Sequence, residues 1–476
     1  MLLDELQAAD LTVLVDYVRD FWLRYASTRT SDPVAPVGLR RPLAEILEEP
    51  LPKSGQSLQT ILESIDAAVV PYAVKTAHPL FLAYVTPPSL DICVLGDAVA
   101  ALLNQNVCFA DLSPVGTAIE ERVVQWLAEI VGYGRTSGGV LVSGGSAANL
   151  YGLAAGRRAA LGSATVSAGN FADWRPQRIY CSEHVHRSVH KAAMLVGVGT
   201  NNIVAVPADE NHEVRLSEMA KLIERDRASG LFVPTTIVGA AGTRESCAFD
   251  DIQGLHEIAK QYDLWLHVDA AYGGFLKLAD PSPKHLQSLH LADSITIDPH
   301  KLLFVPFDSG CFLIRDRQNL LETFGTEGEY LEKSHTPGAD FADFGMELGR
   351  AMRALKVWLA LKYVGVNRFA NEITRLIGLA QYLAERVRQD EDLELLAPVA
   401  GTVVCFRWKR SSHQQEWDLD AINKRIRATL LRDGIAYINE VSLNRQTGLR
   451  VCMTNFRTET RHLDGLLTAV HKCAEA

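Results

Sequence analysis

The segment Ser294-Ile295-Thr296-Ile297-Asp298-Pro299-His300-Lys301-Leu302-Leu303-Phe304-Val305 places a lysine inside an otherwise apolar run. The apolar residues predict a buried strand that leads into a turn. Burying an unpaired ammonium group is costly, so Lys301 needs a partner or a covalent bond. A desolvated lysine can condense with an aldehyde to give a Schiff base. Taken alone, Lys301 is better explained as a strand-end lysine whose tip reaches the surface.

A second segment, Trp265-Leu266-His267-Val268-Asp269-Ala270-Ala271-Tyr272-Gly273-Gly274, predicts an apolar strand that ends in an acid and small residues. The carboxyl ends of strands in an α/β sheet are where ligands bind, and the small residues leave room for a flat one. Asp269 could face the ring nitrogen of pyridoxal 5'-phosphate (PLP) and keep it protonated. The commoner role for such an acid is a helix N-cap.

Two further segments lie upstream. Ser143-Gly144-Gly145-Ser146-Ala147-Ala148-Asn149 joins an apolar strand to a helix, where backbone N–H groups can hold a phosphate. A tight turn before a capped helix is the simpler explanation. The segment Ser182–Lys191 contains three histidines, but no cysteine pair or His-Glu-x-x-His pattern supports a metal site. One histidine could instead stack on a flat ring.

In this order, the phosphate turn, histidine, aspartate and lysine resemble the group II PLP-dependent amino-acid decarboxylases, from about His78 to the C-terminus. That family includes aromatic-L-amino-acid, histidine, glutamate and 2,4-diaminobutyrate decarboxylases. The resemblance implies PLP as cofactor, Lys301 as the Schiff-base lysine and Asp269 as the partner of the pyridine nitrogen. His186 and Ala271 would contact opposite faces of the ring. The implied cofactor-binding set also contains Gly145, Ser146, Thr243, Asp298 and His300.

The chain departs from the family pattern at three positions. Ala147 stands where the family often has glutamate, Arg244 follows Gly242-Thr243 where the family has a second threonine, and Asp298 replaces a common asparagine. Arg244 could bind an oxygen of a substrate or phosphate. An acid such as Asp298 is unfavourable beside a phosphate unless it is paired.

The polar segment Glu329–Gly338 predicts a loop after the lysine segment. Its Tyr330 resembles the family's loop tyrosine, the implied proton donor to Cα, and tyrosine at this position favours simple decarboxylation. Relatives with phenylalanine there can form aldehydes with oxygen. Without the resemblance, Tyr330 would be an ordinary half-exposed loop residue.

The substrate pocket is expected to include Tyr84, Pro87 and Phe109, from the apolar segment His78–Pro88 and the segment around Phe109 and Ser113-Pro114. An apolar and aromatic lining suits an aromatic or other apolar side chain, although core packing explains most of these residues equally well. Arg244 keeps an acidic substrate open. Nothing in the sequence separates tyrosine, DOPA, tryptophan and phenylalanine.

Composition narrows the class of protein. The chain has 476 residues, 47% hydrophobic and 22% charged, as expected for a globular enzyme with one large domain and smaller appendages. The net charge of -10 argues against a nucleic-acid partner. No apolar run reaches the ~20 residues of a membrane span, and the N-terminus does not resemble a signal peptide. The eight scattered cysteines predict reduced core thiols and a cytoplasmic location.

Three parts are expected. Residues 1–77 predict helices that pack on a second subunit. Residues 78–345 predict a large PLP-binding domain with the catalytic loop at 325–345. Its strands and helices alternate, which predicts a mostly parallel, doubly wound α/β sheet of the aspartate-aminotransferase-like fold (fold type I). Residues 346–476 predict a small α+β domain, with strands at Val403–Trp408, Ile435–Asn439 and Leu449–Thr454 and a helix from Gly349 to Val364.

The leading hypothesis is a PLP-dependent carboxy-lyase that decarboxylates an L-amino acid, preferably aromatic, as a homodimer with its active site at the subunit interface. The alternatives are oxygen-dependent decarboxylation-deamination to an aldehyde, and decarboxylation of an acidic or diamino acid. A non-catalytic homologue is a third reading, but a scaffold would need neither Asp269 nor Lys301. An aminotransferase fits the segments around Lys301 and Tyr330 less well.

Overall fold

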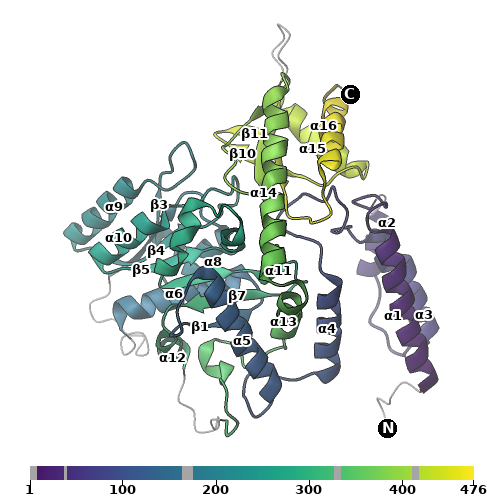
Figure 1. The fold of residues 1–476 in the computed structure, drawn as a ribbon, viewed down its shortest axis with the longest axis horizontal. Coiled ribbons are helices and arrows are strands. Elements are labelled where there is room, and N and C mark those ends of the chain that lie inside the picture. The colour runs from purple at the N-terminus through teal and green to yellow at the C-terminus, as the bar shows by residue number, and fades with distance from the viewer. Residues whose placement is uncertain (1–7, 37–39, 163–174, 326–333, 410–417, 476) are drawn as a thin grey trace.

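The computed structural model describes residues 8–36, 40–162, 175–325, 334–409 and 418–475. Its centre is a seven-stranded sheet of order β1-β7-β6-β5-β4-β2-β3 (Figure 1). The strands are β1 (Gly138–Val142), β2 (Gln177–Ser182), β3 (Ile203–Val206), β4 (Val233–Ala240), β5 (Trp265–Asp269), β6 (Ser294–Ile297) and β7 (Gly310–Ile314). Six of these seven strands run in the same direction, and β7 runs opposite to them. The mostly parallel sheet is confirmed; β7 was not expected.

Helices cover both faces of this sheet, because alternate side chains of each strand point to opposite sides. Val140 and Val142 of β1 pack with Tyr151 of the helix α6 on one face. Leu141 packs with Leu127 of α5 on the other. The helices around the sheet are α5 (Pro114–Val131), α6 (Gly145–Leu161), α8 (Arg187–Leu195), α9 (Leu216–Ser229) and α10 (Ile252–Tyr262). The arrangement is the doubly wound α/β fold that the sequence predicted.

One edge of the sheet collects the ends of several strands. β1 and β6 are both antiparallel to β7, so they run in the same direction, which is also that of β2, β4 and β5. The loops after these five strands therefore meet at one edge, the usual ligand site of such sheets.

A second, antiparallel sheet of order β10-β11-β9-β8 lies towards the C-terminus (Figure 1). Its strands are β8 (Leu393–Leu395), β9 (Val403–Trp408), β10 (Asn439–Leu443) and β11 (Gln446–Cys452). Three helices pack against this sheet: α14 (Val366–Gln389), α15 (Leu419–Arg432) and α16 (Thr460–Glu475). Figure 1 shows α14 running from beside the large sheet to this second one. Residues of both sheets contribute to one continuous hydrophobic core.

The segment after His78 is bound to the second sheet. The N–H groups of Leu82 and Cys452 donate to the carbonyls of Tyr437 and Leu82, and the Tyr437 N–H donates to the Leu80 carbonyl. These bonds hold the neighbouring Tyr84 near both sheets.

Two local expectations were wrong. The strand expected at Ile435–Asn439 begins only at Asn439, because the main chain at Tyr437 bonds to residues 80 and 82 instead of the β10 ladder. The helix expected from Gly349 is α13 (Ala354–Val364). It starts late because the preceding turn places the buried Arg350 guanidinium on Glu120 and on the Val107 and Leu141 carbonyls. The turn expected after the lysine segment's strand is present: Lys301 lies in the four-residue helix α11 (Pro299–Leu302), directly after β6.

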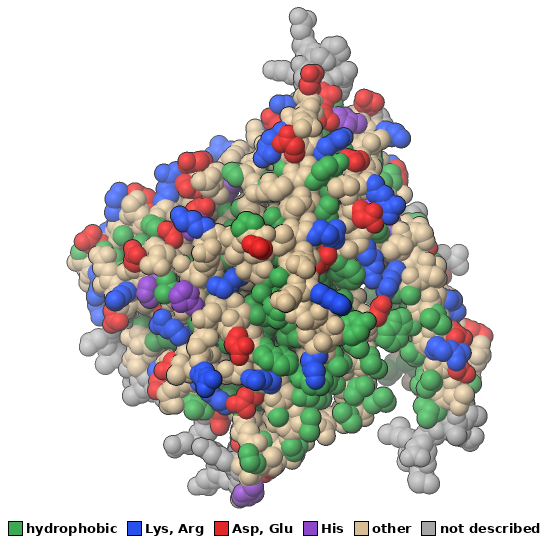
Figure 2. All heavy atoms as spheres, in the orientation of Figure 1, with side chains coloured by type: hydrophobic (Ala, Val, Ile, Leu, Met, Phe, Trp, Pro, Cys, Tyr) green, Lys and Arg blue, Asp and Glu red, His purple; other side chains and the backbone are tan. Residues whose placement is uncertain are grey.

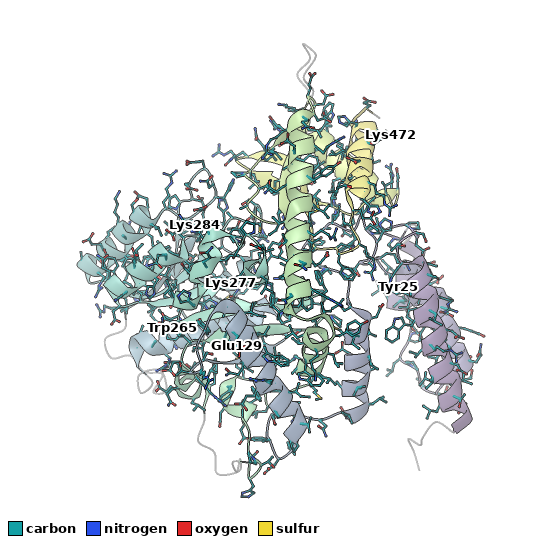
Figure 3. The ribbon with its side chains drawn as sticks, in the orientation of Figure 1. Tyr25, Glu129, Trp265, Lys277, Lys284 and Lys472 are labelled. Atoms are coloured by element: carbon teal, nitrogen blue, oxygen red, sulfur yellow. The ribbon has the colours of Figure 1, made fainter. Side chains whose placement is uncertain are left out.

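The N-terminal helices lie at one side of the molecule (Figure 1). They are α1 (Ala8–Thr28), α2 (Arg40–Leu47) and α3 (Leu58–Ser64), and α4 (Asp91–Leu103) lies between them and the large sheet. Figure 3 shows Tyr25 on α1, and the Lys75 ammonium lies 5.6 Å from the centre of its ring. No helix of the described ranges is both long and apolar enough to cross a membrane.

Candidate active site

A cavity of about 780 Å³ opens at the carboxyl edge of the large sheet, between that sheet and β10–β11. Its volume lies in the range of small-molecule sites. The expected site residues that line it come from the ends of β1, β2, β4, β5 and β6 and from the segment after His78. They are Tyr84, Gly145, Ser146, His186, Thr243, Asp269, Ala271, Asp298, His300 and Lys301.

Two expected residues among the described ones do not line this cavity, and a third cannot be placed. Pro87 is buried and Phe109 is half-buried, and neither borders the space. Tyr330 and much of the expected catalytic loop lie outside the described residues. The roles of these three residues stay predictions.

Lys301 has a charged partner in the cavity wall. Its Nζ lies 3.0 Å from Asp298 Oδ2, and His300 Nε2 lies 3.5 Å from the same oxygen. Burial lowers the pKa of His300, which favours its neutral form. Lys301 thus lies just after β6, and the carboxylate of Asp298 balances the charge of its ammonium group. This carboxylate is the partner that a lysine within an apolar run needs.

The start of α6 forms a narrow backbone cradle. The N-cap residue, Gly144, has no side chain that could accept a hydrogen bond from the first N–H groups of the helix. A Cβ on Gly145 would come within 2.9 Å of the Ala271 Cβ and 3.0 Å of Asp298 Oδ2, so only glycine fits there without displacement. Free N–H groups at a helix N-terminus attract a phosphate or carboxylate.

Asp269 ends β5 with both oxygens bonded. Oδ2 accepts from Asn149 Nδ2 at 2.7 Å, and Oδ1 accepts from the Ala271 N–H at 3.2 Å. It is not a helix N-cap, the commoner role considered from the sequence. The carboxylate is held in one orientation at the cavity wall, as a partner for a ring nitrogen requires.

His186 is the N-cap of α8, and its Nδ1 accepts from the Ser188 N–H at 3.3 Å. The ring lines the cavity. Burial lowers its pKa, which favours a neutral imidazole. Among the described residues, no group of three or more His, Cys, Asp or Glu is arranged to hold a metal ion.

The outer wall contains residues that sequence reasoning did not assign. Arg450 is buried and donates to the carbonyls of Glu245 and Tyr84. Arg244 lines the cavity and is paired with the Glu245 carboxylate. Arg450 could have been found as the single charge in the apolar run Leu449–Met453. Asn439, Glu440 and Ser442 come from β10, which only the fold brings to the site.

The residues present fit PLP. The cavity offers a lysine for the aldehyde, a fixed carboxylate for the ring nitrogen, and a helix N-terminus whose cradle is too tight for any side chain but that of glycine. Asp298 is the one feature that disfavours a phosphate, and its charge is balanced by Lys301.

Known proteins share this fold and sequence pattern. Residues 41–409 match the model of the pyridoxal-dependent decarboxylase conserved domain. An aromatic-L-amino-acid decarboxylase of Bacillus atrophaeus is 32% identical over 90% of this chain and 88% of its own. A 4-hydroxyphenylacetaldehyde synthase of Rhodiola rosea is 29% identical over 96% and 94%. The crystal structure of Oryza sativa TDC with PLP and tryptamine superposes with a TM-score of 0.91 at 26% identity, covering 99% of both chains.

Proposed function

Since the chain belongs to the pyridoxal-dependent decarboxylase family, whose members are PLP-dependent carboxy-lyases of amino acids, we propose that it decarboxylates an aromatic L-amino acid to the corresponding amine. When bound, PLP supplies an electron-accepting ring for the electrons of the broken Cα–carboxylate bond. The observation that carries the proposal is the meeting of Lys301, Asp269, His186 and the α6 N-terminus around one cavity.

The chain's own residues have separate tasks in this proposal. Lys301 would hold the cofactor through its aldehyde. Asp269, fixed by two hydrogen bonds, keeps the ring nitrogen protonated. His186 and Ala271 hold the ring between them, and the N–H groups of Gly145 and Ser146 hold the phosphate. Tyr330 returns a proton to Cα.

The outer wall supports an aromatic substrate over an acidic one. Tyr84 and Val441 border the cavity, and the Tyr84 ring packs edge-on against Tyr437 at 6.0 Å. Arg244, the candidate for binding an acidic side chain, is already paired with Glu245. Arg450 is occupied by two backbone carbonyls. Arg244 is thus balanced by a carboxylate, whereas Arg450 donates only to carbonyls and keeps other N–H groups for the carboxylate that every amino acid carries on Cα.

Oxygen-dependent conversion to an aldehyde is the second candidate, because an aldehyde synthase of Rhodiola rosea is similar over nearly the whole chain. The tyrosine at position 330 favours the amine instead. The two reactions differ in their products, since the aldehyde route also releases ammonia and peroxide.

We also propose a homodimer with the active site at the subunit interface. Figure 2 shows apolar side chains gathered over α4 and the neighbouring α13. The exposed apolar residues of α4 include Leu95, Leu102 and Leu103, and α1 exposes Leu11, Val15 and Val18. A second copy of the chain covering α4 could also supply Phe109, which does not reach the cavity of its own chain. The eight cysteines are buried and unpaired, which supports the cytoplasmic location.

The test is a substrate panel. Purified, PLP-loaded protein is incubated in air with each common L-amino acid, and the products are identified by mass spectrometry with peroxide assayed alongside. Amine from aromatic substrates without peroxide is the expected result. Aldehyde with peroxide would favour the second candidate, and amine only from glutamate, aspartate or a diamino acid would refute the aromatic assignment.

A further inference from the structure

Asn149, which sequence reasoning left without a role, lies buried between the two groups that the proposed function assigns to the cofactor ring. Its Nδ2 donates to Asp269 Oδ2 at 2.7 Å and to Ser188 Oγ at 2.8 Å. Its Oδ1 faces His267 Nε2 at 2.9 Å and accepts from Thr296 Oγ1 at 2.8 Å. All the hydrogen-bonding capacity of this buried amide is used inside the protein.

An indole lies at one end of this set of hydrogen bonds. Trp265 Nε1, which can only donate, bonds Ser294 Oγ at 2.8 Å. The Ser294 hydroxyl is then free to donate to His267 Nδ1, also at 2.8 Å. Because Asn149 turns its Nδ2 to the Asp269 carboxylate, its Oδ1 accepts the proton that His267 carries on Nε2. Figure 3 shows Trp265 on the large sheet, beside α6.

The hydrogen bonds that lead from Asn149 to His186 through Ser188 also have a defined donor and acceptor at each step. Asn149 donates to Ser188 Oγ, so the Ser188 hydroxyl donates to His186 Nδ1 at 2.7 Å, and the Ser188 N–H also points at that nitrogen. With two donors on Nδ1, the imidazole carries its proton on Nε2. The ionised Asp269, which can only accept, demands the same orientation of the Asn149 amide.

The packing around this path leaves it little freedom. A Cβ on Gly152, one turn of α6 after Asn149, would come within 2.3 Å of the His267 ring. Asn149, His267 and Ser294 are all fully or almost fully buried. His267 therefore has no room to turn over, and water has no access to replace a missing partner of its ring.

We propose that Asn149 is a positioning residue that couples Asp269 to His186: it orients the carboxylate and, through Ser188, keeps His186 neutral with its proton on Nε2. The inference rests on the proposed function, because the roles of Asp269 and His186 come from it. The two groups that act on the cofactor ring are thereby held in matched hydrogen-bonding states by one amide.

The test follows the titration of His186 by NMR in PLP-loaded protein labelled with ¹⁵N-histidine. The His186 signal is the one absent from His186→Gln, and its nitrogen shifts report the protonated atom. Ser188→Ala removes one donor from Nδ1 and should raise the pKa of His186 by about one unit, a tenfold change in protonation constant. An unchanged titration in Ser188→Ala would overturn the proposal without any need for a second variant.

Asn149→Asp reverses the relay, because its carboxylate accepts the Ser188 hydroxyl and withdraws it from His186. We expect a larger upward shift than in Ser188→Ala, and a smaller one when Asn149→Asp is made in the Ser188→Ala background. Equal shifts in both backgrounds would mean that the new charge acts through space, and would contradict the relay. The charged groups that already face His186 are Asp269, Lys301, Arg244 and Asp298. In Asn149→Asp the new carboxyl oxygen that faces Asp269 shares a proton with it, because two carboxylates 2.7 Å apart cannot both ionise, and the same oxygen still accepts the Ser188 hydroxyl.

Thr296→Val is the matched control. It removes a buried hydroxyl that bonds the same Asn149 oxygen but lies off the path to His186, so the His186 titration should not move. None of these measurements needs turnover. A protein that binds PLP but decarboxylates nothing would refute the proposed function and leave the network testable, and an active enzyme with an unmoved His186 titration would refute only the network.

Discussion

Asp298 Oδ2 lies 3.0 Å from Lys301 Nζ, and Asp298 Oδ1 is buried with no hydrogen-bond partner in the described structure. The carboxylate therefore has one oxygen that balances the lysine and one that faces the Gly144–Gly145 turn, since a Cβ on Gly310 beside that turn would meet it at 2.8 Å. An anion at this place competes with a phosphate for the same positive partners.

Replacing Asp298 by asparagine should tighten PLP binding. The change removes a negative charge next to the phosphate cradle, and at a few ångströms such a repulsion is worth about 1 kcal/mol, or about fivefold in affinity. Titration of the apo-protein with PLP, followed by absorbance, measures the effect. Asp308→Asn is the control, because Asp308 is a partly exposed carboxylate that pairs with Arg353 outside the cavity. Weaker PLP binding by Asp298→Asn would show that the carboxylate helps to hold the cofactor.

Asp269→Asn should reduce turnover by about a hundredfold or more, with little change in PLP occupancy. The amide keeps the size of the side chain and one acceptor, but it can no longer stabilise a protonated ring nitrogen. Bound PLP and kcat are measured on the same preparation. Asp251→Asn is the matched control, since Asp251 is an ordinary N-cap that accepts from the Gly254 N–H. Parallel loss of cofactor and turnover in Asp269→Asn would point to a structural role.

Tyr330→Phe should shift the product from amine towards aldehyde, because the proposed proton donor to Cα is removed. The ratio of amine to aldehyde is measured by mass spectrometry together with peroxide. Tyr84→Phe serves for comparison: it removes the hydroxyl of another tyrosine at the cavity and should leave the amine as product. An unchanged ratio in Tyr330→Phe would exclude this residue as the proton donor.

The buried His267 should make stability fall in acid. Burial lowers its pKa from the usual 6.5 of histidine to about 4, so between these values the unfolded chain binds a proton that the folded protein does not. The contribution is complete above pH 6.5 and is lost as the pH falls towards 4, by about 3 kcal/mol in all. Denaturant unfolding of the apo-protein across this range measures the slope.

His267→Gln is the variant that isolates this effect, because glutamine keeps a donor and cannot titrate. Its free energy of unfolding should fall less between pH 6.5 and 4 than that of the unaltered protein. An identical slope in the two proteins would mean that His267 is not the group responsible. Burial also lowers the pKa of His186 and His300, so some pH dependence should remain in the variant.

Much of the fold followed from the sequence because the strands of a parallel sheet are short apolar runs between helical crossovers. The strand predicted to end at Asp269 is β5 (Trp265–Asp269), and the strand predicted at the start of the segment Ser294–Val305 is β6 (Ser294–Ile297). β7 was missed because it follows an irregular turn and pairs antiparallel with both neighbours, with no helix to mark a crossover. The start of α13 depends on Arg350 reaching Glu120, 230 residues away, which no local pattern records.

The residues of the candidate site could likewise be predicted only in part from the sequence. Residues at strand ends, such as Asp269 and Lys301, stood out because a charge interrupts an apolar run. Asn149 gave no such signal, since a polar residue near a helix N-terminus is ordinary, and its partners His267 and Ser188 become neighbours only in the folded sheet. The β10 residues at the cavity needed the packing of the second sheet on the first.

Release of labelled carbon dioxide from carboxyl-labelled L-amino acids tests the central claim most directly. PLP-loaded protein should release it from aromatic substrates in a stoichiometric ratio to amine, and Lys301→Ala, assayed at the same protein concentration, should release none. Absence of release from every amino acid by protein that has bound PLP, or undiminished release by Lys301→Ala, would contradict the account.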